Sequence, residues 1–224
     1  MRKAVAAVLV AFLGLACHAD SGNALIAVPY GATVTVDGTM EESEWEAESS
    51  FAASAQCTHY VVHDGTFLYL GIRSGGRGFG SPCLVQSGSV SVLHASAALA
   101  TASYGRDGDQ WVLTQGFASW ECRDEGLTRM ELVPVRDAFL SEHGWITSTG
   151  GMGNHNEVEY AIRLQGEDLR MQLLFYDTGS FPRMVSWPHL EGDLQAYRQL
   201  LDGNLPVRMS FETRRWMTIR TDTP

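Results

Sequence analysis

Histidine and acidic residues are the first candidates for chemistry in this chain. His59 and His63 stand four residues apart, a spacing that joins two metal ligands when both lie on one helix. The residues around them alternate as in a strand, and there such a pair lies about 13 Å apart at roughly 3.3 Å per residue, too far to share an ion. The other histidines are scattered singly, and acid pairs such as Asp107 with Asp109 are typical of solvated turns. We therefore predict neither a metal centre nor a pair of catalytic carboxylates.

The sequence lacks the common motifs for a nucleophile, a phosphate site or a redox pair. The sequence contains no G-x-S-x-G, and the glycine-rich stretch 149–156 lacks the Lys-Ser/Thr of a phosphate-binding loop. It also contains no C-x-x-C, which removes a thioredoxin-like motif, a zinc knuckle and covalently attached haem. We predict that the chain is not an enzyme and has no cofactor; a calcium ion at the Asp64-Gly65 turn is the alternative.

The N-terminus has the organisation of an export signal. Two basic residues precede an apolar run over 4–16, which has the length of a signal-peptide core and is too short to cross a bilayer. The run ends in Leu13-Gly14-Leu15-Ala16-Cys17, which resembles a bacterial lipobox. We predict that residues 1–16 are removed and Cys17 is lipidated, with ordinary cleavage after Ala19 as the alternative.

This signal predicts the location of the protein. Lipidation at Cys17 would leave 17–23 as a tether and place the protein in the periplasm or at the outer membrane; without lipidation it would be secreted. No second apolar run of spanning length follows, so we expect contact with a membrane only through the lipid on Cys17.

Size and charge limit the remaining classes. The chain has 224 residues, 45% of them hydrophobic, which suits a single domain over 24–224. Its 26 acidic and 16 basic residues give a net charge of −10, which repels nucleic acid. If Cys17 carries lipid, the odd set Cys57, Cys83 and Cys122 suggests one disulfide and one thiol; otherwise two disulfides are open, and the pairing is not fixed by the sequence.

Period-two alternation recurs along the chain and predicts a β protein. An Asp64-Gly65 turn between alternating runs at 60–62 and 67–72 predicts a hairpin. Helical spacing occurs only at 41–48, where Trp45 is expected to plug the core, and at 193–201. About nine short strands favour an all-β, antiparallel sandwich of jelly-roll type, with one or two short peripheral helices. Alternation marks 34–37, 59–63 and 67–72, and further candidate strands are 89–93, 99–104, 110–115, 157–164, 171–177, 207–211 and 216–219.

Several ordered motifs carry a resemblance to a known family. Val36-Asp37-Gly38, then Glu44-Trp45 and His63-Asp64-Gly65, are followed by 158–162, 171–177 and Ser186-Trp187-Pro188. In this order they resemble a family 9 carbohydrate-binding module (CBM9), and the resemblance covers 34–187. It implies a DOMON-like β-sandwich that binds sugar by stacking aromatic rings on the pyranose.

The resemblance weakens at the family's own sugar site. The tryptophan and acid expected before 89–93 have no match, since Phe79 and Gly88 occupy that region, and the arginine expected on the next strand is missing. Other aromatics offer a platform, and Trp120 and Trp187 are favoured to face a ligand because polar or proline neighbours place them near loops. Core packing is the alternative for each tryptophan. The predicted carbohydrate-binding residues are Phe79, Trp111, Trp120, Arg123 and Trp187.

Three functions remain open from the sequence. The first is an exported, non-catalytic protein of the bacterial cell envelope that binds carbohydrate or cell-wall glycan, and assists polysaccharide catabolism through a partner enzyme. The second is a DOMON-like haem or electron-transfer domain with histidine and methionine ligands, for which Met130, Met152 and Met184 are available. The third is an envelope interaction module that has lost its sugar site.

Overall fold

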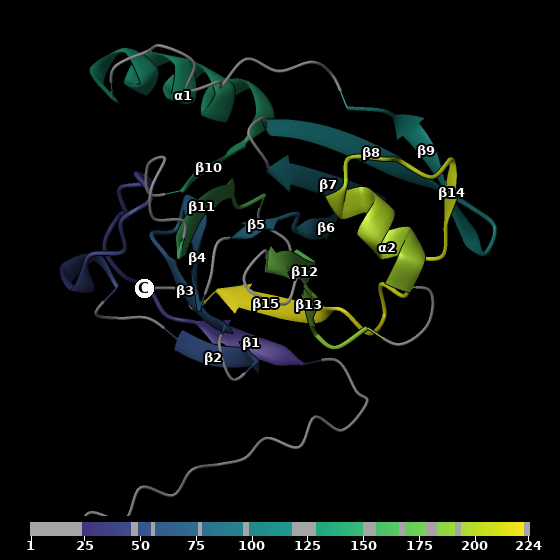
Figure 1. Ribbon diagram of the computed structural model, residues 1–224, viewed down its shortest axis with the longest axis horizontal. Helices are drawn as coiled ribbons and strands as arrows, with labels where there is room; N and C mark the ends of the chain where they lie inside the picture. Colours follow the sequence, from purple (N-terminus) through teal and green to yellow (C-terminus); the bar gives the residue numbers. More distant parts are fainter. Residues whose placement is uncertain are drawn as a thin grey trace, which may run out of the picture.

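Two β-sheets packed on each other form the body of the molecule (Figure 1). The computed structural model describes residues 24–45, 49–54, 57–75, 78–95, 99–117, 129–149, 156–165, 169–177, 183–190 and 194–221. Sheet A has ten strands, in the order β1-β15-β12-β6-β7-β8-β9-β14, with β13 and β5 also paired to β12. Sheet B has five, in the order β10-β11-β4-β3-β2. The predicted antiparallel sandwich is confirmed, with one parallel pair, β1 and β15.

The elements have the following bounds. The strands of sheet A are β1 (Leu25–Val28), β5 (Gly78–Gly80), β6 (Cys83–Gln86), β7 (Ser89–Ala95), β8 (Leu99–Asp107), β9 (Gln110–Gln115), β12 (Leu169–Asp177), β13 (Arg183–Trp187), β14 (Arg208–Met209) and β15 (Met217–Thr221). Those of sheet B are β2 (Ser49–Ser54), β3 (Cys57–His63), β4 (Phe67–Ser74), β10 (Trp145–Thr149) and β11 (Glu157–Arg163). The helices are the 3-10 turn η1 (Glu42–Glu44), α1 (Arg129–His143) and α2 (Leu194–Leu201).

The main core lies between the two sheets. Strands β3, β4 and β11 place every second side chain in it, because strand side chains alternate between faces. Polar groups that enter this core find partners across the sheets. The Tyr160 hydroxyl donates to the Gly80 carbonyl at 3.1 Å, and Trp145 Nε1 donates to Thr101 Oγ1 at 2.8 Å. These bonds join sheet B to β5 and β8.

A second, smaller core covers the other face of sheet A, under α2. The helix places Tyr197, Leu200 and Leu201 against the aromatic rings of Trp111, Phe211 and Trp216. The helical spacing at 193–201 predicted this element and is confirmed. Gly203, with φ of +77°, follows the helix as a left-handed stop.

The hairpin predicted at Asp64-Gly65 is present between β3 and β4. Asp64 Oδ1 accepts from the backbone N–H groups of Thr66 and Phe67, both at 2.8 Å. Gly65 has φ of +87°, which a residue with a Cβ rarely adopts. The Tyr69 hydroxyl donates to Asp64 Oδ2 at 2.7 Å and ties the turn to β4.

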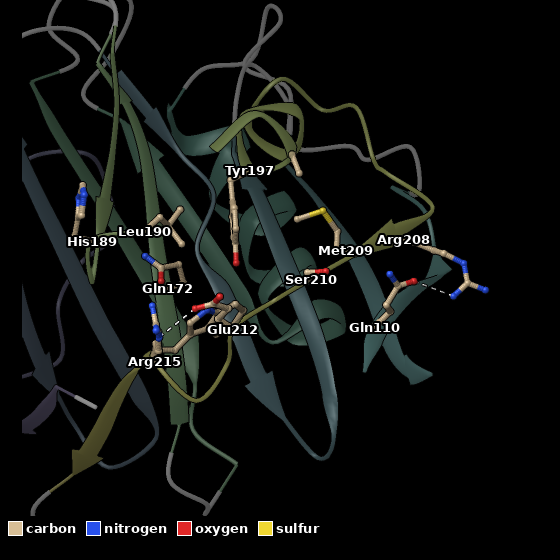
Figure 2. A pocket seen from close by; sticks show the side chains of 12 residues that line it. Gln110, Gln172, His189, Leu190, Tyr197, Arg208, Met209, Ser210, Glu212 and Arg215 are labelled. Carbon is tan, nitrogen blue, oxygen red and sulfur yellow. Dashed lines mark hydrogen bonds and ion pairs between the residues drawn. The ribbon is translucent and has the colours of Figure 1, made fainter. Parts of the chain in front are cut away.

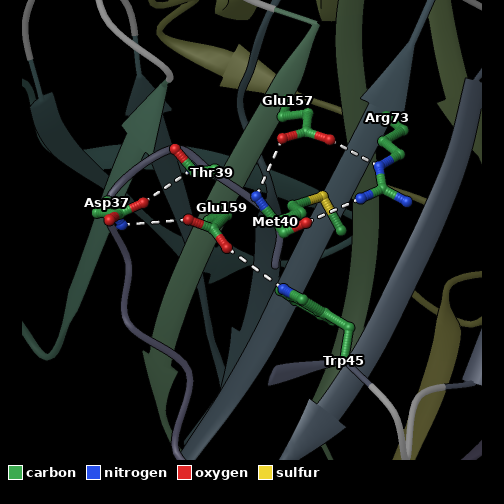
Figure 3. A network of polar contacts seen from close by, with 7 residues as sticks. All are labelled: Asp37, Thr39, Met40, Trp45, Arg73, Glu157 and Glu159. Carbon is green, nitrogen blue, oxygen red and sulfur yellow. Dashed lines mark hydrogen bonds and ion pairs between the residues drawn. The ribbon is translucent and has the colours of Figure 1, made fainter. Parts of the chain in front are cut away.

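The segment 31–45 covers the outer face of sheet B as a loop (Figure 3). Glu159 on β11 accepts from the backbone N–H of Gly38 at 2.8 Å, that of Asp37 at 3.1 Å and Trp45 Nε1 at 3.3 Å. Two residues earlier on the same face, Glu157 binds Arg73 Nε at 2.7 Å. Trp45 is 5% exposed, which confirms it as a core side chain.

The strand predicted at 34–37 is therefore wrong. The alternating valines belong to a loop, in which Val34 is buried against sheet B. The backbone N–H groups of this segment bond to carboxylates instead of a neighbouring strand: that of Thr35 donates to Glu44 Oε1 at 3.1 Å, and those of Asp37 and Gly38 donate to Glu159. The helix predicted at 41–48 is only the 3-10 turn η1 where the chain is described.

Two further differences concern the second half of the chain. Helix α1 was not predicted; it contains Pro134, and its apolar residues show little helical periodicity. It packs on β10 through Phe139, whose ring lies 5.5 Å from that of Trp145. The strand predicted at 207–211 is shortened to β14. Among the described residues, no helix is long and apolar enough to cross a membrane.

The two described cysteines lie in different cores. Cys57 belongs to the main core, with Sγ 3.8 Å from His59 Nε2. Cys83 belongs to the core under α2, where burial raises the pKa of its thiol. No disulfide joins this pair. Cys17 and Cys122 lie outside the described residues, so their predicted lipidation and pairing remain predictions.

Candidate functional site

The predicted site residue Trp111 lies inside the core under α2. It is 4% exposed, and its indole N–H donates to the Phe211 carbonyl at 3.3 Å. The Arg106 guanidinium lies over the ring, 5.2 Å from its centre. Trp111 is therefore a core side chain, which was the alternative to ligand binding for each tryptophan.

Trp187 is half-buried at the end of β13, at the edge of the main core. Its ring centre lies 4.2 Å from that of Phe51 on β2, with 32° between the planes. This contact joins β13 of sheet A to the edge strand of sheet B. Trp111 and Trp187 pack in different cores.

Three other predicted site residues are not placed. The backbone of Phe79 is in β5, opposite Tyr176, but its side chain lies outside the described part of the structure. Trp120 and Arg123 also lie outside the described residues.

The histidine pair lies on β3, as the alternation indicated, and faces the main core. His59 is 1% exposed and His63 is 2% exposed. Burial lowers the pKa of His59 to about 3, so its imidazole is neutral. Within the described ranges, no three histidine, cysteine or acidic side chains lie close enough together to hold a metal ion.

A pocket of about 210 Å³ opens between α2, the segment that follows it and β12 (Figure 2). This volume is below the roughly 300–1,000 Å³ of sites for drug-sized ligands, so the pocket suits one small unit. None of the predicted site residues lines it. The lining residues are Gln110, Gln172, His189, Leu190, Ala196, Tyr197, Arg208, Met209, Ser210, Glu212, Arg215 and Trp216.

Two buried hydrogen-bond donors belong to this lining. Tyr197 is 4% exposed and Trp216 is 1% exposed. The Tyr197 hydroxyl has no acceptor among the described residues, and the Trp216 indole N–H lies toward the Tyr197 oxygen. Burial raises the pKa of Tyr197, while the Trp216 indole N–H and the backbone N–H of Glu212 act in the opposite direction on it. The phenol is therefore protonated at neutral pH and available as a donor.

Gln172 supplies an acceptor on the β12 side of the pocket. Its side chain is 2% exposed, and Nε2 donates to the Pro188 carbonyl at 2.6 Å. A carbonyl accepts only from the amide nitrogen, so this bond fixes the orientation of the side chain. Oε1 is left toward the pocket, on the side of Tyr197 and Glu212 (Figure 2).

The charged residues at the pocket rim form ion pairs. Arg215 Nε lies 3.2 Å from Glu212 Oε2, and Arg208 Nη1 lies 3.2 Å from Asp107 Oδ2. Arg208 also donates to Gln110 Oε1 at 3.3 Å. Since each arginine already has a carboxylate partner, the rim offers little net positive charge to an anion.

The sequence contained one signal for this pocket. On the predicted helix 193–201, Tyr197 is the only residue of the apolar face that carries a polar group. A buried tyrosine hydroxyl needs a hydrogen-bond partner, and the apolar face of the predicted helix offers none. Trp216 and Gln172 carry no such signal, because the pattern around each residue predicts only a strand, at 216–219 and at 171–177.

No protein-family profile and no curated protein matches this chain. Among solved structures, a CBM9 domain from Caldicellulosiruptor kristjanssonii in complex with cellotriose aligns at 11% identity, TM-score 0.46, covering 89% of this chain and 94% of its own. A putative carbohydrate-binding protein from Bacteroides uniformis aligns at 10% identity, TM-score 0.48, covering 90% of this chain and 100% of its own. With identities near 10% and TM-scores below 0.5, these alignments transfer no role to this chain or to any of its residues.

Proposed function

We propose that this chain is an exported, non-catalytic protein of the bacterial cell envelope that binds one carbohydrate unit in the pocket between α2 and β12. One observation carries the proposal: the pocket has a mixed lining, in which the polar side chains of Gln172 and Tyr197 lie beside the apolar Leu190 and Met209. The Tyr197 hydroxyl has no acceptor among the described residues, and a buried donor without an acceptor costs about 1–3 kcal/mol, so a ligand oxygen that accepts from it gains affinity.

The other lining residues favour a neutral, polar ligand. Gln172 Oε1 accepts hydrogen bonds, and the rim arginines are already paired with Glu212 and Asp107. A sugar unit presents several hydroxyl groups and an apolar ring face, which match such a mixture of polar and apolar side chains. The sequence resemblance to family 9 carbohydrate-binding modules points to the same ligand class.

Calorimetric titration of the soluble form, from Asp20 onward, with neutral monosaccharides tests the proposal. We expect Tyr197→Phe to weaken binding about fivefold or more, through the loss of one hydrogen bond. The same variant should keep or slightly gain stability, because the hydroxyl that it removes has no acceptor in the described structure.

Tyr104→Phe is the matched control. Tyr104 lies in the same core, and its hydroxyl donates to the Pro206 carbonyl at 3.0 Å outside the pocket. We expect unchanged affinity and a loss of about 1 kcal/mol in the free energy of unfolding. Absence of binding to any neutral sugar at millimolar concentration counts against the proposal and leaves the envelope interaction module. A Soret band in protein from haem-replete cells would instead favour the haem domain.

The location is a separate part of the proposal. We infer that residues 1–16 are removed, that Cys17 is lipidated and that 17–23 form a tether before the domain 24–224. Because the proposed protein is non-catalytic, any role in polysaccharide catabolism runs through a partner enzyme. Cells fed labelled palmitate should label the wild-type protein, while Cys17→Ala should carry no label and leave the membrane fraction. A Cys17→Ala protein that stays labelled places the lipid elsewhere.

A further inference from the structure

The outer face of sheet A continues past the pocket over β12, β15 and β1. Gln172 on β12 and Trp216 before β15 line the pocket. Because strand side chains alternate between faces, Arg170 and Thr218, each two residues from a lining residue, lie on the same face as the pocket. They are paired across β12 and β15, and Leu25 on β1 is paired with Thr218. This row lies about 7 Å from the lining residues along the strands, at roughly 3.3 Å per residue.

The side chains of this surface are open to solvent. Leu25 is 55% exposed, and Arg170 is also exposed. One row further on, the exposed Arg220 is paired with the exposed Ala27. The alternate residues of the same strands fill the main core. We call this surface, formed by Leu25, Ala27, Arg170, Thr218 and Arg220, the arginine face.

The two arginines of this face are not neutralised by a carboxylate. Arg73, Arg208 and Arg215 each form an ion pair, but no described carboxylate pairs with Arg170 or Arg220. The two occupy diagonal positions on neighbouring strands, about 7–8 Å apart, where their like charges repel. On a chain with a net charge of −10, this pair forms a local site for an anion. A guanidinium binds a carboxylate through two parallel hydrogen bonds.

We propose that the glycan bound in the pocket continues over the arginine face and carries a carboxylate there, which makes the ligand an acidic polysaccharide with uronic acid units. This inference rests on the proposed function and names its substrate class. The unit inside the pocket is neutral, because the rim arginines are paired with Glu212 and Asp107. The carboxylate belongs to a neighbouring unit, within reach of Arg170 and Arg220, while Leu25 offers apolar surface to a sugar ring.

An anionic membrane surface is the competing occupant, because the proposed tether over 17–23 ends beside Leu25. The glycan is favoured by the position of Arg170, two residues from Gln172 on the same face of β12.

Calorimetric titration of the soluble form, from Asp20 onward, with acidic oligosaccharides and their neutral methyl esters tests the inference. The probes are the tetrasaccharides of hyaluronan and chondroitin, and xylotriose substituted with glucuronic acid, all of which combine neutral and uronic acid units. At low salt we expect at least one acid to bind about fivefold or more tighter than its ester, the effect of two exposed ion pairs. Because salt screens exposed charges, this ratio should fall to about twofold or less in roughly 1 M salt.

Variants of the two arginines locate the contact. Arg170→Gln and Arg220→Gln should each about halve the ratio, and the double variant should bind acid and ester equally. Arg163→Gln is the matched control, because it removes the same charge from an exposed residue of sheet B that lies over the Phe67 ring. It should leave the ratio unchanged. All three arginines are exposed, and melting temperatures check that each variant is folded.

The outcomes separate the two proposals. Esters that bind as tightly as their acids overturn the inference and leave the carbohydrate pocket standing. A preference for the acid that persists in the double variant also overturns it, since the carboxylate is then bound elsewhere. Binding to phosphatidylglycerol vesicles that the double variant loses, with no acid preferred, overturns it in favour of a membrane-facing surface. Absence of binding by every acid and ester overturns the inference, and it counts against the proposed function if neutral monosaccharides also fail to bind.

Discussion

Gly80→Ala is expected to lower the free energy of unfolding by about 3 kcal/mol. A Cβ at this position would lie 2.9 Å from the Tyr160 hydroxyl and 3.2 Å from the Leu174 carbonyl. The hydroxyl cannot stay in place, so the 3.1 Å bond from Tyr160 to the Gly80 carbonyl is lost. Overpacking costs about 1–3 kcal/mol and an unsatisfied buried polar group about 1–3 kcal/mol, offset by 0.4–1 kcal/mol because alanine restricts the unfolded chain.

Gly116→Ala is the matched control for this prediction. Its Cβ would approach only Leu205 Cδ1, at 4.0 Å, so the entropic gain should remain and the variant should be neutral or more stable by about 0.5 kcal/mol. Urea unfolding followed by tryptophan fluorescence measures both variants. Similar stabilities for the two alanine variants would show that the contact between β5 and β11 does not hold the sheets together.

The sequence was most informative where a local pattern decides the structure. The hairpin between β3 and β4 follows from Asp64 and Gly65, since their own bonds and φ angle close the turn. Helix α2 follows from its apolar spacing. Segment 34–37 alternates as a strand does, but backbone N–H groups in and next to it donate to the carboxylates of Glu44 and Glu159 rather than to a neighbouring strand. A pattern within one segment cannot tell these partners apart.

The pocket could be predicted from the sequence only in small part. Gln172, Tyr197 and Trp216 come from β12, α2 and the segment before β15, and only the folded chain brings them together. What marks the site is a buried Tyr197 hydroxyl without an acceptor among the described residues, a property of the surroundings and not of residue type. Trp187 was favoured for its loop neighbours and Trp111 as part of an aromatic platform, whereas both rings pack within the protein.

Glu159→Gln is expected to remove a pH dependence of stability that the wild-type protein shows between about pH 4.5 and 7. Burial raises the pKa of Glu159 from 4.5 to about 7, and the hydrogen bonds from Gly38, Asp37 and Trp45 lower it by less. The negative charge of Asp37 adds to the rise. The folded state therefore binds more protons than the unfolded state in this window, and stability falls as the pH rises through it.

The expected size follows from the same linkage. At about 1.4 kcal/mol per pH unit, the window corresponds to roughly 3 kcal/mol lost by the wild-type protein between pH 4.5 and 8. In Glu159→Gln the side chain is neutral throughout, so its stability relative to the wild type should improve by that amount over the same range. Urea unfolding at several pH values measures the difference, in which the titration of His59 and other groups common to both proteins cancels.

Glu157→Gln separates burial from charge in this network. Glu157 lies two residues earlier on the same face of β11, bonded to Arg73 at 2.7 Å, with its side chain 28% exposed rather than fully buried (Figure 3). Removing this carboxylate should leave the wild-type pH dependence in place, because the buried charge at Glu159 is still there. Parallel stability curves for the wild type and Glu159→Gln would mean that the three donors compensate the burial of the carboxylate in full. The loop over sheet B would then be held by Glu159 equally at acidic and neutral pH.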